Sequence, residues 1–289
     1  MKGKLKSPCA YQGAKQRVAG ELIDCIYNDI EDIVNNLEEI TFYDLCCGSG
    51  AVTLELLNRG IKAEKVVMCD ISTWGAFWQA IGEGTYDLER FYKYSRAVPR
   101  DKGLVQTYIK ELAGESADID EEYKYILIQA AAFGGKPIWK RDGVWKNTSF
   151  RDYWQPTATS SRRSPVNPMQ PEIEEIEERV QNLVKYARGL HCYHADISVM
   201  LDVIKADRGS KVIYIDPPYK NTAGYGSTFD VREIVQKLID GGIETIYVSE
   251  KERLDGAAKA YRLNFSGNKG GVLGNTKKRG EEWLNIFRG

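Results

Sequence analysis

The chain has 289 residues, of which 43% are hydrophobic and 28% are charged, and its formal net charge is −1. This composition is typical of a globular protein with one large domain, or with one domain that carries an insertion. It argues against a protein that coats nucleic acid, which would be strongly basic. No apolar run approaches the ~20 residues of a membrane-spanning helix.

The cysteines and the first residues indicate the cellular compartment of the protein. The six cysteines include no Cys-x-x-Cys pair, and the chain has only two histidines, so we expect neither a metal site nor a disulfide framework. Residues 1–6 are basic but no apolar stretch follows them, so we expect no signal peptide. Reduced thiols are the default in the cytosol, and we expect a cytoplasmic protein. The sequence leaves the oligomeric state open and is compatible with a monomer.

Strands and helices alternate at both ends of the chain but not in its middle. Near the start, the apolar spacing predicts helix within 15–38, a strand over 40–46, a helix over 51–58 and a strand over 65–69. In the middle it predicts helices over 86–94, 102–113 and 121–132, a Gly/Trp/Lys-rich stretch over 134–155, a loop over 156–171 and a long helix over 172–188. Toward the end it predicts strands over 190–194, 211–215 and 244–249, helices over 198–206 and 230–240, and a last apolar segment over 282–287.

This order predicts an α/β fold with a doubly wound, mostly parallel sheet of the Rossmann-like type. One domain would be formed by residues 1–84 and 186–289. A mainly helical insertion over residues 85–185 would interrupt it.

A glycine-containing turn follows the first predicted strand. Gly48 and Gly50 stand between this strand and the next helix, where glycine lets a ligand approach the backbone closely. Asp70 ends the second strand, twenty residues after Gly50, and a carboxylate at that place accepts hydrogen bonds from both hydroxyls of a ribose. Two other interpretations stay open at this point, namely a plain turn and an Asp70 that caps the following helix.

Residues 216–219 read Asp-Pro-Pro-Tyr and follow the β-branched, aromatic strand 211–215. The end of a central parallel strand is where open α/β sheets bind ligands. Two prolines fix the backbone and remove two N–H donors, and their carbonyls remain as acceptors. A carboxylate, a rigid row of carbonyls and an aromatic face form a receptor for a flat ring that bears an amino group. The alternative is a tight exit turn.

Residues 136–163 hold seven basic residues against two acidic ones, a net charge of +5. Trp139, Trp145 and Trp154 are interleaved with them. Such a stretch either contacts phosphates or forms a solvated face.

The Gly turn, the acid on the second strand and the later Asp-Pro-Pro-Tyr resemble S-adenosylmethionine-dependent amino-methyltransferases. More narrowly, the chain resembles the DNA adenine methylase (Dam-like) family, and the resemblance covers nearly its whole length. Residues 11–15, Tyr-Gln-Gly-Ala-Lys, look like the family's Trp-x-Gly-Gly-Lys segment, and residues 277–284 are similar to its closing Arg-x-x-x-Glu-x-Leu strand. Residues 193–197 are similar to the stretch that holds the cofactor's adenine, and residues 134–147 resemble, more loosely, the stretch beside the recognition domain.

The resemblance implies S-adenosylmethionine as the cofactor, double-stranded DNA as the partner, and an insertion that recognises the target sequence; it implies no metal. The cofactor contacts it implies are Tyr11, Lys15, Asp44, Cys46, Gly48, Ser49, Gly50, Asp70, Ile71, Asp196 and Ile197. The catalytic residues it implies are Asp216, Pro217, Pro218 and Tyr219. The insertion would contact nucleic acid through Lys136, Lys140, Arg141, Lys146, Asn147, Arg151, Arg162 and Arg163.

These residue types suit methyl transfer to an exocyclic nitrogen. Hydrogen bonds from the amino group to the Asp216 carboxylate and the Pro217 carbonyl would localise the lone pair toward the methyl donor. Tyr219 would stack on the base, which must leave the duplex to reach the pocket. Tyr225 and Phe229 would either help to hold it or belong to the core.

Two alternatives remain. An RNA adenine or cytosine-amino methyltransferase would use the same Asp-Pro-Pro-Tyr. A non-catalytic nucleic-acid-binding relative would retain only the fold, and it is suggested by three departures from the family pattern, Ala14, Cys46 and Ile197.

Overall fold

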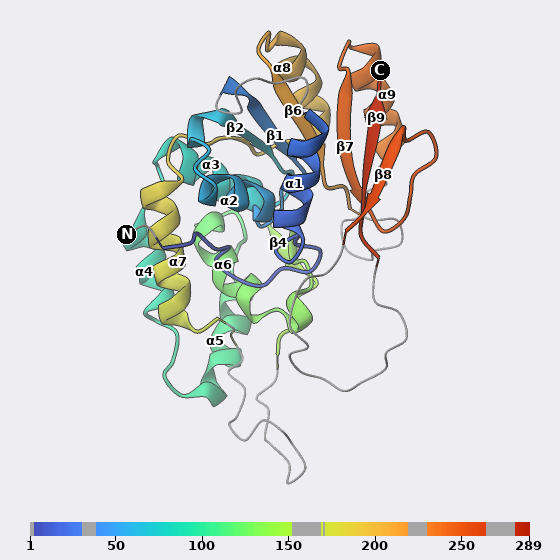
Figure 1. Cartoon of the computed structure of the whole chain (residues 1–289). Helices are drawn as coiled ribbons and strands as arrows, with labels where there is room; N and C mark the ends of the chain where they lie inside the picture. The colour runs from blue at the N-terminus through green and yellow to red at the C-terminus, as the bar shows by residue number, and fades with distance from the viewer. Residues whose placement is uncertain (1–2, 31–38, 152–168, 170, 219–229, 264–280) are drawn as a thin grey trace.

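The computed structural model describes residues 3–30, 39–151, 169, 171–218, 230–263 and 281–289. Its centre is a seven-stranded sheet with the strand order β5-β2-β1-β6-β7-β9-β8 (Figure 1). The strands are β1 (Thr41–Leu45), β2 (Val66–Cys69), β5 (His191–Tyr193), β6 (Lys211–Ile215), β7 (Thr245–Glu250), β8 (Lys259–Arg262) and β9 (Trp283–Arg288). The five strands from β5 to β7 in this order run parallel, while β9 is antiparallel to both of its neighbours. The predicted α/β class with a mostly parallel sheet is therefore confirmed.

The two faces of the sheet belong to two separate hydrophobic clusters. Successive side chains of a strand point to opposite faces, and in β1 Phe42 joins one cluster while Tyr43 and Leu45 join the other. The first cluster takes in α1 (Ala19–Ile30), α2 (Ala51–Asn58) and α3 (Thr73–Glu83). The second takes in α8 (Met200–Ala206) and α9 (Val231–Asp240). The result is a sheet covered by helices on both faces, as a doubly wound pattern requires.

The described part of the segment between β2 and β5 shares a hydrophobic cluster with helices that cover the sheet. Its helices are α4 (Leu88–Ser95), α5 (Lys102–Gly114), α6 (Glu121–Ala131) and α7 (Ile173–Tyr186), and a hairpin of β3 (Trp139–Arg141) and β4 (Val144–Lys146) follows α6. In Figure 1 these helices lie beneath the sheet, on the side of α2 and α3. Phe91 and Tyr125 from this segment share the first hydrophobic cluster with Trp78 of α3. The division at residues 85 and 185 into two domains therefore stays a prediction.

Most predicted elements correspond to observed ones, and the differences are local. The helix predicted over 51–58 is α2, and the strand predicted over 211–215 is β6. Helix α3, the β3–β4 hairpin and strand β8 were not predicted. Of the helix predicted within 15–38 the structure describes α1, and residues 31–38 lie outside the described part. Among the described residues, no helix is both long and apolar enough to cross a membrane.

Helix α3 lies directly against the backbone at the end of β2 and the start of β5 because two glycines on it lack a Cβ. A Cβ on Gly75 would lie 2.1 Å from the Asp70 carbonyl oxygen, and one on Gly82 would lie 2.1 Å from the Leu190 carbonyl oxygen. Both contacts are to backbone atoms, which cannot rotate away. Gly75 and Gly82 are seven residues apart, about two helical turns, so they lie on the same face of α3.

We expect the Gly82→Ala substitution to destabilise the protein by ~1–3 kcal/mol, because the added methyl group overpacks a site closed by main chain. Equilibrium urea unfolding measures this difference. Gly114→Ala is the matched control, since a Cβ there meets nothing within 4 Å and alanine favours the helix by up to ~1 kcal/mol. Equal effects of the two substitutions would contradict the close approach of α3 to β5.

Candidate functional site

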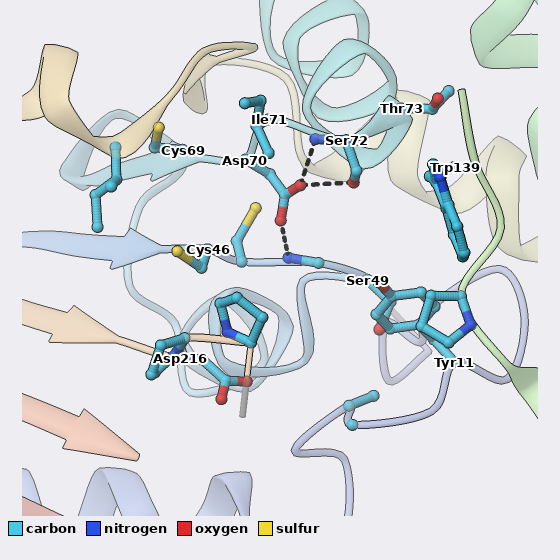
Figure 2. Close-up of a pocket in the computed structure, with 18 of the residues that line it drawn as sticks. Tyr11, Cys46, Ser49, Cys69, Asp70, Ile71, Ser72, Thr73, Trp139 and Asp216 are labelled. Carbon is cyan, nitrogen blue, oxygen red and sulfur yellow. Dashed lines mark hydrogen bonds between the residues drawn. The ribbon is translucent and has the colours of Figure 1, made fainter. Parts of the chain in front are cut away.

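A cavity of about 520 Å³ opens at the carboxyl ends of the central strands (Figure 2). The chain runs from β1 outward to β2 and β5, then returns to β6 on the other side of β1. This reversal of strand order is where doubly wound sheets bind ligands, and the volume is that of a small-molecule site. The cavity walls come from residues 11–15, 46–49, 69–73, 139–141, 194–197 and 216–218, together with Asp44, Ala51, Val52, Glu121, Pro137 and Lys251.

The turn after β1 is shaped by a tryptophan that the sequence did not point to. Trp78 of α3 donates its indole N–H to the Gly48 carbonyl at 3.0 Å. A Cβ on Gly50 would lie 2.4 Å from the Trp78 ring, and the Gly50 φ angle is +72°. Gly50 was predicted to contact the cofactor, but its close neighbour is this indole. Cys46 has a φ angle of +60°, a strained value for a residue with a side chain.

The Asp70 carboxylate connects the turn after β1 to the start of α3. Its Oδ2 accepts a hydrogen bond from the Gly48 N–H at 2.7 Å, and its Oδ1 accepts from the N–H and hydroxyl of Ser72 at 2.8 and 2.5 Å (Figure 2). The cap of α3 is Ser72, which accepts from the Trp74 N–H. A carboxylate has about four acceptor positions, so three bonds leave Asp70 room for a ribose hydroxyl.

Asp44 was predicted to contact the cofactor, and in the structure it also holds the first turn of α2. Its Oδ2 accepts hydrogen bonds from both the N–H and the hydroxyl of Thr53, at 3.1 and 2.7 Å, which fixes the first turn of α2. Burial raises the pKa of the Asp44 carboxyl to about 7, although the Thr53 hydrogen bonds oppose this, and the nearby Asp216 charge raises it further.

Asp44 should therefore make stability depend on pH. A carboxyl whose pKa is higher in the folded chain contributes stability below its unfolded pKa of about 4, and this contribution is lost as the pH rises toward 7. The amide of an Asp44→Asn variant would accept the same Thr53 bonds without titrating. We expect the stability of this variant, relative to the parent, to rise between pH 4 and pH 8 by up to a few kcal/mol, at ~1.4 kcal/mol for each unit of pKa change. Denaturant titrations across this range measure the effect, and parallel stability curves for the two proteins would contradict it.

The centre of the site is an ion pair between residues 201 positions apart. Lys15 Nζ donates to Asp216 Oδ1 at 2.6 Å and to the Gly13 carbonyl at 3.1 Å. It also lies 3.7 Å from Glu282 Oε1, a partner that sequence reasoning did not identify. The Lys15 side chain is only 4% exposed, while that of Asp216 is 18% exposed and faces the cavity.

Two opposing effects act on Asp216. Burial raises the pKa of its carboxyl, and the Lys15 ammonium lowers it. Its backbone N–H donates to the Leu45 carbonyl at 3.0 Å, so the end of β6 is tied to the end of β1. Pro217 and Pro218 follow directly and line the cavity, whereas Tyr219, Tyr225 and Phe229 lie outside the described residues.

The loop that follows β5 places Asp196 and Ile197 at the same cavity. Asp196 caps a short 3-10 helix by accepting from the Ser198 N–H at 2.9 Å, and the Ser198 hydrogen bonds lower the pKa of its carboxyl. The side chain of Ile197 packs into the second hydrophobic cluster. Ile71, by contrast, is 65% exposed on the cavity wall, so it offers an apolar surface to a ring.

Ser49 supplies an independent sign that a polar ligand belongs here. Its side chain is buried and lines the cavity, yet its hydroxyl has no hydrogen-bond partner among the described residues. Buried polar atoms are normally satisfied. A ligand with a hydrogen-bonding group at this wall would satisfy the Ser49 hydroxyl.

The predicted nucleic-acid contacts divide into two groups. Lys140 pairs with Glu121 and, at 3.1 Å, with Asp118, and Asn147 donates to the Pro137 carbonyl at 2.6 Å. Arg151 is partly buried, and burial lowers the pKa of its guanidinium. In this structure Lys140 and Asn147 are thus engaged within the protein. Lys136 and Arg141 are exposed and Lys146 is partly exposed, while Arg162 and Arg163 lie outside the described residues.

The described part of the chain contains no group of three or more His, Cys, Asp or Glu side chains arranged to hold a metal ion. No known family model matches the sequence, and no curated protein matches it.

Proposed function

We propose that the protein is an S-adenosylmethionine-dependent methyltransferase that acts on the exocyclic amino group of adenine in double-stranded DNA. The observation that carries this proposal is the position of Asp216. Its carboxylate lines the cavity just after the end of β6 and is held by Lys15, and the Pro217 carbonyl follows it in the chain.

The Asp216 carboxylate suits the recognition of an amino group. The Lys15 ion pair uses Oδ1, so Oδ2 is the oxygen that would accept from an incoming N–H. Pro217 and Pro218 have no N–H of their own, which leaves carbonyl acceptors next to it. Two acceptors that hold the two amino hydrogens would direct the nitrogen lone pair away from the ring, and acceptors fixed before the reaction need no reorganisation.

Lys15 would keep Asp216 in its accepting form. Burial favours the protonated carboxyl, which is a poorer acceptor, and the ammonium at 2.6 Å favours the ionised one. The proton released from the methylated nitrogen can pass to water at the open side of the cavity.

The remaining walls fit the proposed cofactor. S-adenosylmethionine would supply a methyl group activated by its sulfonium charge, so the protein needs no covalent intermediate. Asp70 has acceptor capacity for ribose, Ile71 presents an apolar face for adenine, and the Ser49 hydroxyl needs a partner. These groups lie on successive strand-end loops of one cavity.

The experiment is incubation of the protein with isotope-labelled S-adenosylmethionine and either duplex DNA or RNA of mixed sequence, followed by mass spectrometry of the nucleosides. We expect labelled N6-methyladenine in DNA. Label in RNA alone would overturn DNA as the substrate. No label in either polymer, with cofactor binding confirmed by calorimetry, would overturn the transferase activity.

A further inference from the structure

The β3–β4 hairpin has two different faces. Lys140 and Trp145 are cross-strand partners and so point to the same side. That side packs on α6, because Trp145 is buried and stacks on Tyr125 at 5.7 Å, and Lys140 pairs with Glu121. Neighbouring residues on a strand point the other way. Trp139 therefore points away from α6, and it lines the cavity.

The hairpin is fixed to the loop that carries Asp70. Glu121 accepts from the Thr73 hydroxyl at 2.6 Å and also pairs with Lys140. Thr73 is the first residue of α3 and follows Asp70 by three positions. Glu121 thus links Lys140, the residue after Trp139, to Thr73, which follows the loop proposed to bind ribose. This link helps to fix the position of the Trp139 indole at the cavity wall.

Trp139 stands across the cavity from the two carboxylates that frame it. In Figure 2 Asp70 and Asp216 lie on one side, and Trp139 and Tyr11 lie on the other. Cys46, the residue directly after β1, also lines the cavity but offers no aromatic face. A ligand that fills the cavity from these two carboxylates to the opposite wall would contact the indole. A tryptophan face attracts a cation more strongly than any other side-chain ring.

Resting on the proposed function, we propose that Trp139 is a positioning residue of the cofactor site, with its indole against the sulfonium-bearing half of S-adenosylmethionine. The hairpin then belongs to the cofactor site as well as to the DNA-facing surface. The attraction distinguishes the charged sulfonium from the neutral thioether S-adenosylhomocysteine, because only the former interacts with the ring as a cation.

The test compares the affinities of S-adenosylmethionine and S-adenosylhomocysteine by calorimetry in the parent, Trp139→Leu and Trp139→Phe proteins. We expect Trp139→Leu to weaken binding of the sulfonium about 3- to 30-fold more than binding of the thioether. Trp139→Phe keeps an aromatic face and should restore most of this ratio. Equal losses for both ligands, or an unchanged ratio, would overturn the proposal.

A second measurement does not require the leucine variant to fold. Fluorotryptophan incorporated throughout the chain weakens the negative ring face without changing its shape. We expect it to lower the ratio of the two affinities in the parent protein but not in Trp139→Phe, and the same change in both proteins would overturn the role of Trp139. A parent protein that binds neither ligand would instead refute the proposed function.

Discussion

Substitution of Asp216 by asparagine is expected to lower the methyl-transfer rate at least ~100-fold and to leave the cofactor affinity within about threefold of the parent. The amide has nearly the shape of the carboxylate, but it carries no charge and can present N–H where an acceptor is needed. Loss of one fixed, preorganised hydrogen-bonding group costs ~10²–10³ in rate in comparable sites. Single-turnover kinetics with saturating cofactor measures the effect on the transfer step.

The control for this experiment is Asp255→Asn. Asp255 is 93% exposed and pairs on the surface with Arg232 at 3.2 Å, and such pairs contribute ~0–1 kcal/mol. We expect its rate to be unchanged. A parental rate for Asp216→Asn would remove Asp216 from the reaction, and with it the main support for the proposed function.

Substitution of Lys15 by methionine should change both the pH dependence and the stability. Burial, the larger effect, raises the pKa of the Asp216 carboxyl, and Lys15 opposes it, so removal of the ammonium leaves burial unopposed. Because the proposed reaction would need ionised Asp216, the acid limb of the pH–rate profile should move to higher pH. Breaking a buried pair costs ~3–5 kcal/mol, and we expect the lower end because Asp216 is 18% exposed.

Lys15→Arg separates charge from shape in this test. Arginine keeps a positive charge near Asp216, so the acid limb should stay close to that of the parent even if the rate falls. An acid limb at the same pH in Lys15→Met and the parent would show that Lys15 does not tune Asp216. A loss of stability alone would assign Lys15 a structural role.

The sequence was sufficient for the parallel strands and for the end of the sheet that holds the candidate site. Apolar runs such as 211–215 mark buried strands, and parallel strands bring the residues after them to one edge. Asp70 and Asp216 could be placed at one edge on that basis, whereas Asp44 and Asp196 were implied by the family resemblance; all four line the cavity. Helix α3 was harder, because Trp74, Phe77 and Trp78 are all buried and leave little alternation to read.

Partners far apart in the chain could not be predicted. The Lys15–Asp216 pair joins positions 201 apart, and the sequence contains no signal of which acid a given lysine meets. For the same reason Lys140 was assigned to phosphates, although Glu121 and Asp118 engage it. The β3–β4 hairpin was missed because its strands have three residues each and carry charge, too short for a pattern of period two.

The shared hydrophobic cluster limits how this protein could be re-engineered. Trp74 and Phe77 of α3 pack in one core with Tyr86, Phe91 and Tyr125 from the segment after it. Removal of the described part of residues 85–185 would therefore expose the indole of Trp74 and the ring of Phe77, and would destabilise the Gly turn that Trp78 holds. Changes to this segment that keep the aromatic packing intact would have to be made at exposed side chains such as Lys136 and Arg141.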